Sequence, residues 1–182
     1  MITVFTPTYN RAYRLPVLYR SLLCQTDHNF EWLIVDDGSQ DDTRDLISSW
    51  IAESPGFPIR YFYQENSGKH CAVNLGVIHA KSEWFFIVDS DDYLLEDAVE
   101  KIHQWISTVD SEEIAAVSGT KCFPDRCIIG SCQVMADGYL DAANNERRKY
   151  GLLGDKAEVY RTKILKEFPF PVFPGERFIP EG

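Results

Sequence analysis

Three carboxylates follow one apolar run within four residues. Asp89, Asp91 and Asp92 come directly after the run 84–88, which is wholly apolar. Carboxylates this close repel one another unless a metal ion or hydrogen bonds compensate their charge, and aspartate oxygens are the ligands that Mg²⁺, Mn²⁺ and Ca²⁺ prefer. The cluster therefore predicts a divalent-cation site. The alternative is an acidic turn in which Asp92 caps the next helix, but a cap needs only one carboxylate.

The elements that must position these carboxylates alternate regularly along the chain. Short β-rich runs and longer helical patterns succeed one another over the first 120 residues, which is typical of βα units joined into a parallel sheet. Apolar residues recur at helical spacing between the runs, so the helices are expected to cover the sheet faces. Strands are predicted at 2–6, 31–36, 59–63, 84–88 and 114–118, with a further strand at 155–161 and a short helix at 162–168.

Polar residues follow four of the predicted strands. They lie in the segments 6–11, 36–39, 66–70 and 89–92. Taken singly, each segment is an ordinary turn or helix start. The carboxyl ends of parallel strands share one sheet edge, however, so the four segments are expected to converge there. The coincidence favours a ligand site at this edge.

Composition narrows the function classes. The chain has 182 residues, 45% of them apolar, which fits one globular domain. A formal net charge of −10 argues against a nucleic-acid partner. The apolar runs are far shorter than the roughly 18 residues that span a bilayer, and no signal peptide opens the chain, so we expect a cytoplasmic protein. Five cysteines without a secretory leader indicate reduced thiols.

The four polar segments resemble four successive motifs of one enzyme family. Thr6-Pro7-Thr8-Tyr9-Asn10-Arg11, the run 35–43, Asn66-Ser67-Gly68-Lys69 and Asp89-Ser90-Asp91-Asp92 are similar in order and spacing to motifs of the family 2 inverting glycosyltransferases. The resemblance implies the GT-A fold, a Rossmann-like, mostly parallel central sheet flanked by helices in an α/β/α sandwich. It also implies a nucleotide-sugar donor, usually one built on uridine diphosphate.

The resemblance assigns the donor site to particular residues. The backbone around Pro7 and the side chains of Tyr9, Asp36 or Asp37, and Lys69 correspond to positions that hold the nucleotide base and ribose. Asp89 belongs to this donor-binding set as well.

Asp89 and Asp91 also match the family's DxD motif, in which an aspartate holds a divalent cation, Mn²⁺ or Mg²⁺, against the donor diphosphate. Asp92 is the less favoured metal ligand. A cation there would offset the charge on the departing diphosphate as a Lewis acid.

Inversion implies a general base that deprotonates the acceptor hydroxyl. The family usually carries this base as an acidic residue, often within Glu-Asp, at the start of a helix well after the metal motif. No Glu-Asp pair occurs in that region here, and the stretch 173–181 resembles the corresponding part of some bacterial relatives. Glu181 is therefore the candidate base and Glu176 the runner-up. A solvated carboxylate is the alternative for both.

We expect one catalytic domain over 1–182, with a nucleotide-sugar part at 1–120 and an acceptor-side part at 121–182. The chain ends without a closing element, which suggests a piece of a longer protein and leaves peripheral association with the inner face of the membrane open. The predicted function is transfer of a sugar to a saccharide or lipid-linked hydroxyl in cell-surface polysaccharide synthesis. The alternatives are a nucleotidyltransferase and a non-catalytic nucleotide-sugar-binding domain.

Overall fold

The computed structural model describes residues 1–109, 111–131, 140, 142–143, 146 and 148–178. Contacts group the chain into two compact units. The larger unit comprises Met1–Val117 and Val159–Gly182, and the smaller one comprises Ser118–Glu158. The larger unit carries every predicted site residue, while the organisation as a single catalytic domain stays a prediction.

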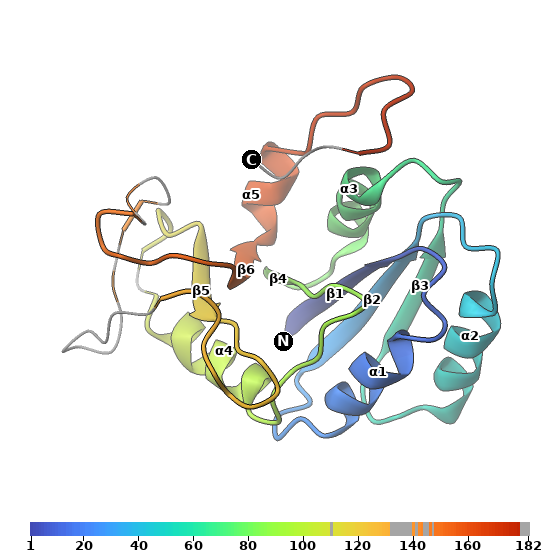
Figure 1. The fold of residues 1–182 in the computed structure, drawn as a ribbon, viewed down its shortest axis with the longest axis horizontal. Coiled ribbons are helices and arrows are strands. Elements are labelled where there is room, and N and C mark those ends of the chain that lie inside the picture. The colour runs from blue at the N-terminus through green and yellow to red at the C-terminus, as the bar shows by residue number, and fades with distance from the viewer. Residues whose placement is uncertain (110, 132–139, 141, 144–145, 147, 179–182) are drawn as a thin grey trace. The chain divides into compact units, whose positions relative to one another are not determined.

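A six-stranded sheet in the order β3-β2-β1-β4-β6-β5 forms the centre of the fold (Figure 1). The first four strands pair in parallel, and β6 pairs antiparallel with β4. The predicted mostly parallel sheet is therefore confirmed. The fifth strand begins two residues later than expected. The strand bounds are β1 Ile2–Thr8, β2 Phe30–Asp36, β3 Ile59–Tyr63, β4 Trp84–Ile87, β5 Ala116–Thr120 and β6 Lys156–Arg161.

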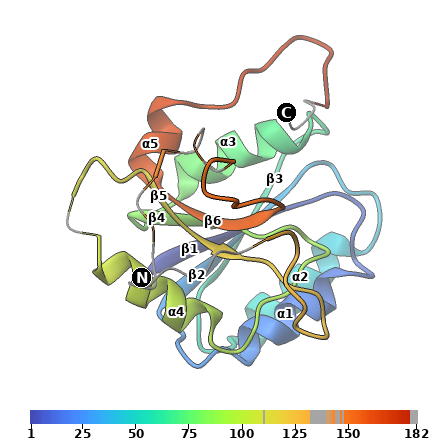
Figure 2. The ribbon, with the colours of Figure 1, turned by 60° about the vertical axis from the view of Figure 1, so that its left-hand side comes forward.

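Helices cover both faces of the sheet in the larger unit. Helices α1 and α2 lie on one face, and α3 and α5 lie on the other (Figures 1 and 2). Among the described residues, no helix combines the length and apolar character that crossing a membrane requires. The helix bounds are α1 Leu15–Leu23, α2 Thr43–Glu53, α3 Lys69–His79, α4 Ala98–Ser107 and α5 Thr162–Glu167.

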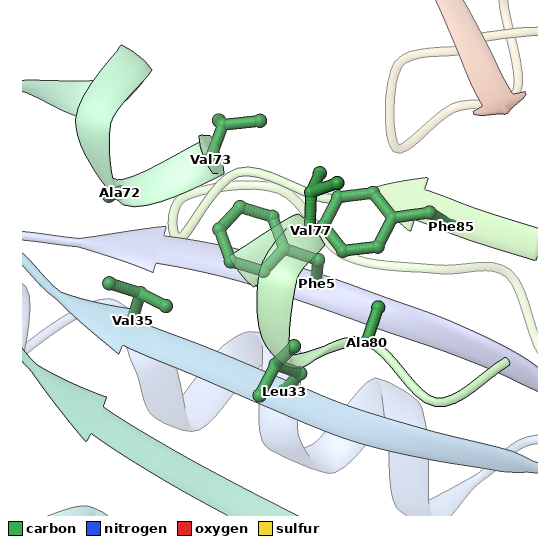
Figure 3. Close-up of a cluster of buried hydrophobic side chains, with 8 residues drawn as sticks. All are labelled: Phe5, Leu33, Val35, Ala72, Val73, Val77, Ala80 and Phe85. Carbon is green, nitrogen blue, oxygen red and sulfur yellow. The ribbon is translucent and has the colours of Figure 1, made fainter. Parts of the chain in front are cut away.

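Two apolar layers hold these helices on the sheet. On the α3 face, Phe5 of β1 stacks on Phe85 of β4 with ring centroids 4.9 Å apart (Figure 3). On the α1 and α2 face, the rings of Tyr19 and Trp50 stack with centroids 4.3 Å apart, the Trp32 ring lies about 6 Å from both, and all three residues are buried. Each large side chain buried in this way stabilises the fold by roughly 1.5–3 kcal/mol. The two layers fix the sheet edge on which the site is built.

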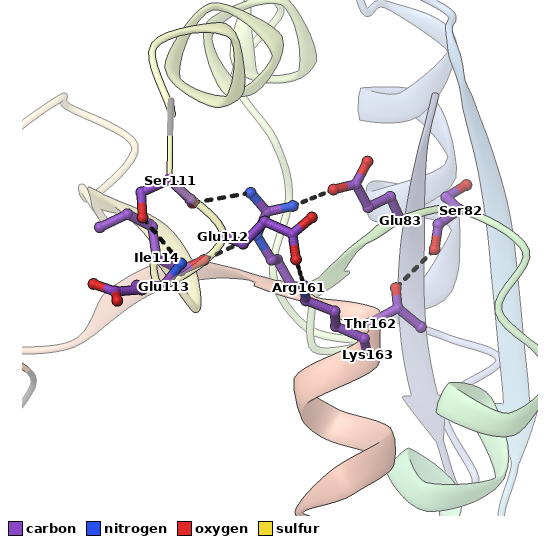
Figure 4. A network of polar contacts seen from close by, with 9 residues as sticks. All are labelled: Ser82, Glu83, Ser111, Glu112, Glu113, Ile114, Arg161, Thr162 and Lys163. Carbon is purple, nitrogen blue, oxygen red and sulfur yellow. Dashed lines mark hydrogen bonds and ion pairs between the residues drawn. The ribbon is translucent and has the colours of Figure 1, made fainter.

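A polar network anchors β6 at the end of the larger unit's sheet. The buried guanidinium of Arg161 pairs with Glu83 and donates hydrogen bonds to the carbonyl oxygens of Ile114, at 2.9 Å, and Ser111, at 3.3 Å (Figure 4). The guanidinium also lies 4.6 Å from the centroid of the Trp84 ring. These contacts satisfy a buried cation, because its donors meet a carboxylate and two carbonyls.

Candidate functional site

The carboxylate of Asp36 is buried at the carboxyl end of β2 and is bonded through both oxygens. Its Oδ1 accepts a hydrogen bond from the Ser39 N–H at 2.8 Å, and its Oδ2 accepts one from the Tyr61 hydroxyl at 2.7 Å. Burial raises the pKa of Tyr61, and the hydrogen bond to Asp36 raises it further. Tyr61 therefore stays a proton donor at neutral pH and holds this carboxylate in place.

Asp37 binds the loop that follows β3. Its Oδ1 accepts hydrogen bonds from the Gln64 side chain at 2.7 Å and from the Ser67 N–H at 2.8 Å. Its Oδ2 accepts one from the Gly68 N–H at 2.9 Å, immediately before α3 begins. A carboxylate bonded to three donors is a rigid joint, because each bond to a charged acceptor is stronger than a neutral one. Asp37 thereby fixes where α3 starts relative to β2.

The loop after β1 is tied to the loop after β2. The Asn10 N–H donates to Ser39 Oγ at 2.8 Å, and Asn10 Oδ1 accepts from the Gln40 N–H at 2.8 Å. Near the end of β1, Pro7 is buried, while the side chain of Tyr9, directly after β1, is 46% exposed. Tyr9 thus presents an aromatic surface to solvent at the predicted edge. The donor-binding roles of Pro7 and Tyr9 stay predictions.

Lys69 and Asp89 meet across the edge. Lys69 is the first residue of α3 and Asp89 follows β4, and the lysine Nζ lies 2.9 Å from one carboxylate oxygen and 3.1 Å from the other. The Lys69 side chain is 48% exposed and the Asp89 side chain 37%. The Asp92 N–H donates to the Asp89 carbonyl at 3.0 Å, which closes a turn with exposed Asp91 inside it. The structure therefore unites the third and fourth polar segments, as the sheet topology predicts.

The acidic turn supplies oxygen ligands suited to a hard cation. Across the part of the chain that the structure describes, no three His, Cys, Asp or Glu side chains are gathered into a metal-binding group. The donor chemistry nevertheless fits, since the Asp89 carboxylate already binds a cationic group, Lys69, and Asp91 is exposed beside it. Asp89 and Asp91 are therefore the residues that would hold a Mg²⁺ or Mn²⁺ ion.

Only one of the two candidate bases lies among the described residues. Glu181 lies outside the described residues. Glu176 is exposed, and its N–H donates to the Phe173 carbonyl at 3.1 Å, so it closes a turn. Its carboxylate is thus accessible to a ligand, and its role stays a prediction.

Comparison with known proteins identifies the family. Residues 3–164 match the model of glycosyl transferase family 2. The chain belongs to this family. The glycosyltransferase GlyG of Streptococcus pneumoniae is 33% identical over 115 residues, which is 63% of this chain and 38% of GlyG. An uncharacterized glycosyltransferase of Rickettsia felis is 39% identical over 99 residues, which is 54% of this chain and 16% of that protein.

Solved structures of glycosyltransferases share the fold. S. aureus TarS 1–349, crystallised in complex with UDP-GlcNAc, superposes with a TM-score of 0.68 at 26% identity and covers 93% of this chain. The mannosyltransferase PcManGT from Pyrobaculum calidifontis, in complex with GDP-Man and Mn²⁺, gives 0.68 at 20% identity, also over 93%. The glycosyltransferase chain described here spans 48% of the TarS chain and 47% of the PcManGT chain. The GT-A fold is thereby confirmed.

Two residues that build this glycosyltransferase site are not predicted by the sequence motifs. Tyr61 and Gln64 hold Asp36 and Asp37 in place, yet neither lies in a motif. Tyr61 sits inside a strand, where an aromatic residue predicts packing. Two adjacent carboxylates, if buried, need hydrogen-bond donors, but the sequence does not show which residues supply them.

Proposed function

We propose that this family 2 glycosyltransferase transfers a sugar, with inversion, from a nucleotide-diphosphate donor to a hydroxyl of a saccharide or lipid-linked acceptor. The observation that carries the proposal is the pairing of Lys69 with Asp89 at the sheet edge that also presents Tyr9. A uridine diphosphate donor is favoured because TarS, at 26% identity, is known in complex with UDP-GlcNAc.

The donor would be held by aromatic and charged groups together. The exposed ring of Tyr9 offers a face on which a nucleobase stacks. Lys69 offers an ammonium to the diphosphate, and as the first residue of α3 it lies at a helix start, whose N–H groups attract anions. The bonded carboxylates of Asp36 and Asp37 keep these loops in position, and their contact with the nucleotide is part of the proposal.

Asp89 and Asp91 are the residues that would hold a Mn²⁺ or Mg²⁺ ion, with Asp92 as the less favoured ligand. When bound, such an ion compensates the negative charge of the diphosphate leaving group. Lys69 contributes a second positive charge from the start of α3, where its Nζ lies 2.9 Å from the Asp89 carboxylate.

Transfer forms one bond and breaks another at the anomeric carbon. The acceptor oxygen attacks this carbon as the bond to the diphosphate oxygen breaks, and the hydroxyl proton passes to a carboxylate base. Glu181 is the proposed base and Glu176 the alternative. The setting we propose is cell-surface polysaccharide synthesis at the cytoplasmic side of the membrane.

Nucleotide binding tests the proposal directly. Titration calorimetry with UDP and Mn²⁺ should show binding that weakens about tenfold or more in Tyr9→Ala and in Lys69→Ala, since each loses a direct contact. Tyr13→Ala serves as control, because Tyr13 is also an exposed tyrosine of the loop after β1. Normal affinity in both site variants would reject this donor site.

Turnover separates an enzyme from a binding domain. We expect UDP release from UDP-GlcNAc or another UDP-sugar in the presence of Mn²⁺. Binding without release with any tested acceptor would favour the non-catalytic alternative. Release of pyrophosphate from UTP and a sugar 1-phosphate would favour a nucleotidyltransferase.

A further inference from the structure

The segment that follows α5 turns back along α3. We call residues 168–178 the strap; they leave the end of α5, and the strap's far end reaches the start of α3 (Figures 1 and 2). Both elements belong to the larger unit. The strap contains no regular helix or strand, so side-chain contacts must fix its path.

Asn74 fixes the first part of the strap. Its Nδ2 donates to the Phe170 carbonyl at 2.9 Å, and its Oδ1 accepts from the Phe170 N–H at 2.9 Å. One side-chain amide thus replaces the pair of hydrogen bonds that a neighbouring strand would provide. The contact joins residues 96 positions apart, so no local tendency of the strap accounts for it.

A tight turn shapes the middle of the strap. The Glu176 N–H donates to the Phe173 carbonyl at 3.1 Å, across Pro174 and Gly175. Gly175 has a φ of 83°, which only glycine adopts readily, and proline followed by glycine is the usual pair in such a turn. The turn makes the position of Glu176 depend on where the strap is anchored.

Gly68 receives the far end of the strap. A Cβ atom at Gly68 would lie 2.8 Å from the Arg177 carbonyl carbon and closer still to its oxygen, so only glycine leaves room for the strap here. Gly68 also donates its N–H to Asp37, and the next residue is Lys69, which pairs with Asp89. Arg177 therefore lies against the backbone that carries the proposed diphosphate contact.

The strap end also lies over a buried imidazole. His70 is 5% exposed, and neither ring nitrogen has a hydrogen-bond partner among the described residues. Its Cε1 lies 2.8 Å from the position that a Cβ atom at Gly68 would take, as does the Arg177 carbonyl carbon. The strap end and the His70 ring therefore meet at Gly68.

We propose that Asn74 is a positioning residue: through Phe170 it holds the strap so that residues 176–177 form a wall of the donor site beside Lys69. Glu176 is then the described carboxylate that borders the point where an acceptor hydroxyl enters. This last step rests on the proposed function, whereas the clamp itself does not.

Hydrogen exchange of the strap tests the clamp. In Asn74→Ala, the Phe170 amide should exchange about tenfold faster, because it loses one hydrogen bond of ordinary strength. Asn74→Asp keeps an acceptor for this N–H but no donor for the Phe170 carbonyl, so it should give an intermediate rate. Asn29→Ala is the matched control, since Asn29 precedes β2 at the opposite sheet edge. Unchanged exchange in both Asn74 variants would overturn the clamp.

Coupling to the nucleotide tests the wall. UDP with Mn²⁺ should slow exchange of residues 175–178 and tryptic cleavage after Arg177 in the wild type. Asn74→Ala should lose this protection even at UDP concentrations that saturate the variant. A solely structural role would leave the protection in place. UDP binding without strap protection in the wild type refutes the inference alone. Failure of UDP to bind at all refutes the proposed function and the wall with it.

Discussion

Two acidic motifs lie on the same sheet edge and do different work. Asp36 and Asp37 are 1% and 5% exposed, and each of their carboxylate oxygens accepts a hydrogen bond from the protein. Asp89 is about one-third exposed in its side chain and pairs with Lys69, and Asp91 is exposed. The carboxylates of the first motif join the loop after β2 to β3 and to the loop that follows it. The second motif presents charge to solvent.

The contrast teaches that a carboxylate's role depends on the number of donors the fold brings to it. Buried charge is tolerated only when it is fully bonded, and its bonds then become part of the scaffold. An exposed carboxylate keeps its hydration and exchanges it for a cation at little cost. Stability should therefore depend on Asp37, and metal-dependent binding on Asp91.

The largest effect is expected from Asp37→Ala. The substitution leaves three donors, from Gln64, Ser67 and Gly68, without their acceptor. We expect the free energy of unfolding to fall by about 3 kcal/mol, which urea denaturation measures. Asp91→Ala is the control and should leave the urea midpoint unchanged. Equal loss in the two variants would erase the distinction between the motifs.

Asp91→Ala should instead remove the metal-dependent part of nucleotide binding. We expect UDP affinity in Mn²⁺ to fall about tenfold or more, because a direct cation ligand is lost. Calorimetry with and without EDTA measures the difference. If Mn²⁺ strengthens UDP binding equally in the variant and the wild type, the assignment of Asp91 as a metal ligand fails.

The pH dependence of stability in Tyr61→Phe tests whether Tyr61 holds the buried Asp36 carboxylate. The raised pKa of Tyr61 means that the folded protein holds this proton more tightly than the unfolded chain does. Its contribution is therefore complete below the ordinary tyrosine pKa of about 10 and declines as the pH rises above that value. We expect Tyr61→Phe to lower the free energy of unfolding by about 1 kcal/mol at pH 7. Between pH 9 and roughly 11, the variant should lose less of its stability than the wild type does.

Urea midpoints at several pH values measure this difference. Tyr63→Phe is the matched control, because Tyr63 is half exposed at the end of the same strand. Parallel alkaline losses in the wild type and Tyr61→Phe would show that Tyr61 is not the titrating group.

The smallest effect on stability is expected from Lys69→Met. The two side chains of the ion pair are 48% and 37% exposed, so solvent screens the pair and its loss should cost no more than about 0.5 kcal/mol. Thermal unfolding in low and high salt measures it. A much larger loss would mean that the Lys69–Asp89 pair belongs to the scaffold, as Asp37 does.

The sequence by itself determined the sheet, the order of its elements and the edge that carries the polar segments. Apolar periodicity reports burial locally, and parallel strands place their carboxyl ends together whatever the loops contain. The four motifs also indicated the family, which the match over residues 3–164 confirms. Strand ends moved by one or two residues, since local pattern does not fix where a ladder stops.

Only the tertiary structure decided which carboxylates are part of the scaffold and where the strap lies. The hydroxyl that bonds Asp36 comes from Tyr61, 25 residues away, and the amide that holds Phe170 comes from Asn74, 96 residues away. Such partners meet because the chain crosses between strands and returns along α3. The type of a side chain and its neighbours in sequence do not specify these long-range partners. The role of the side chain therefore depends on the donors and charges that the fold places beside it.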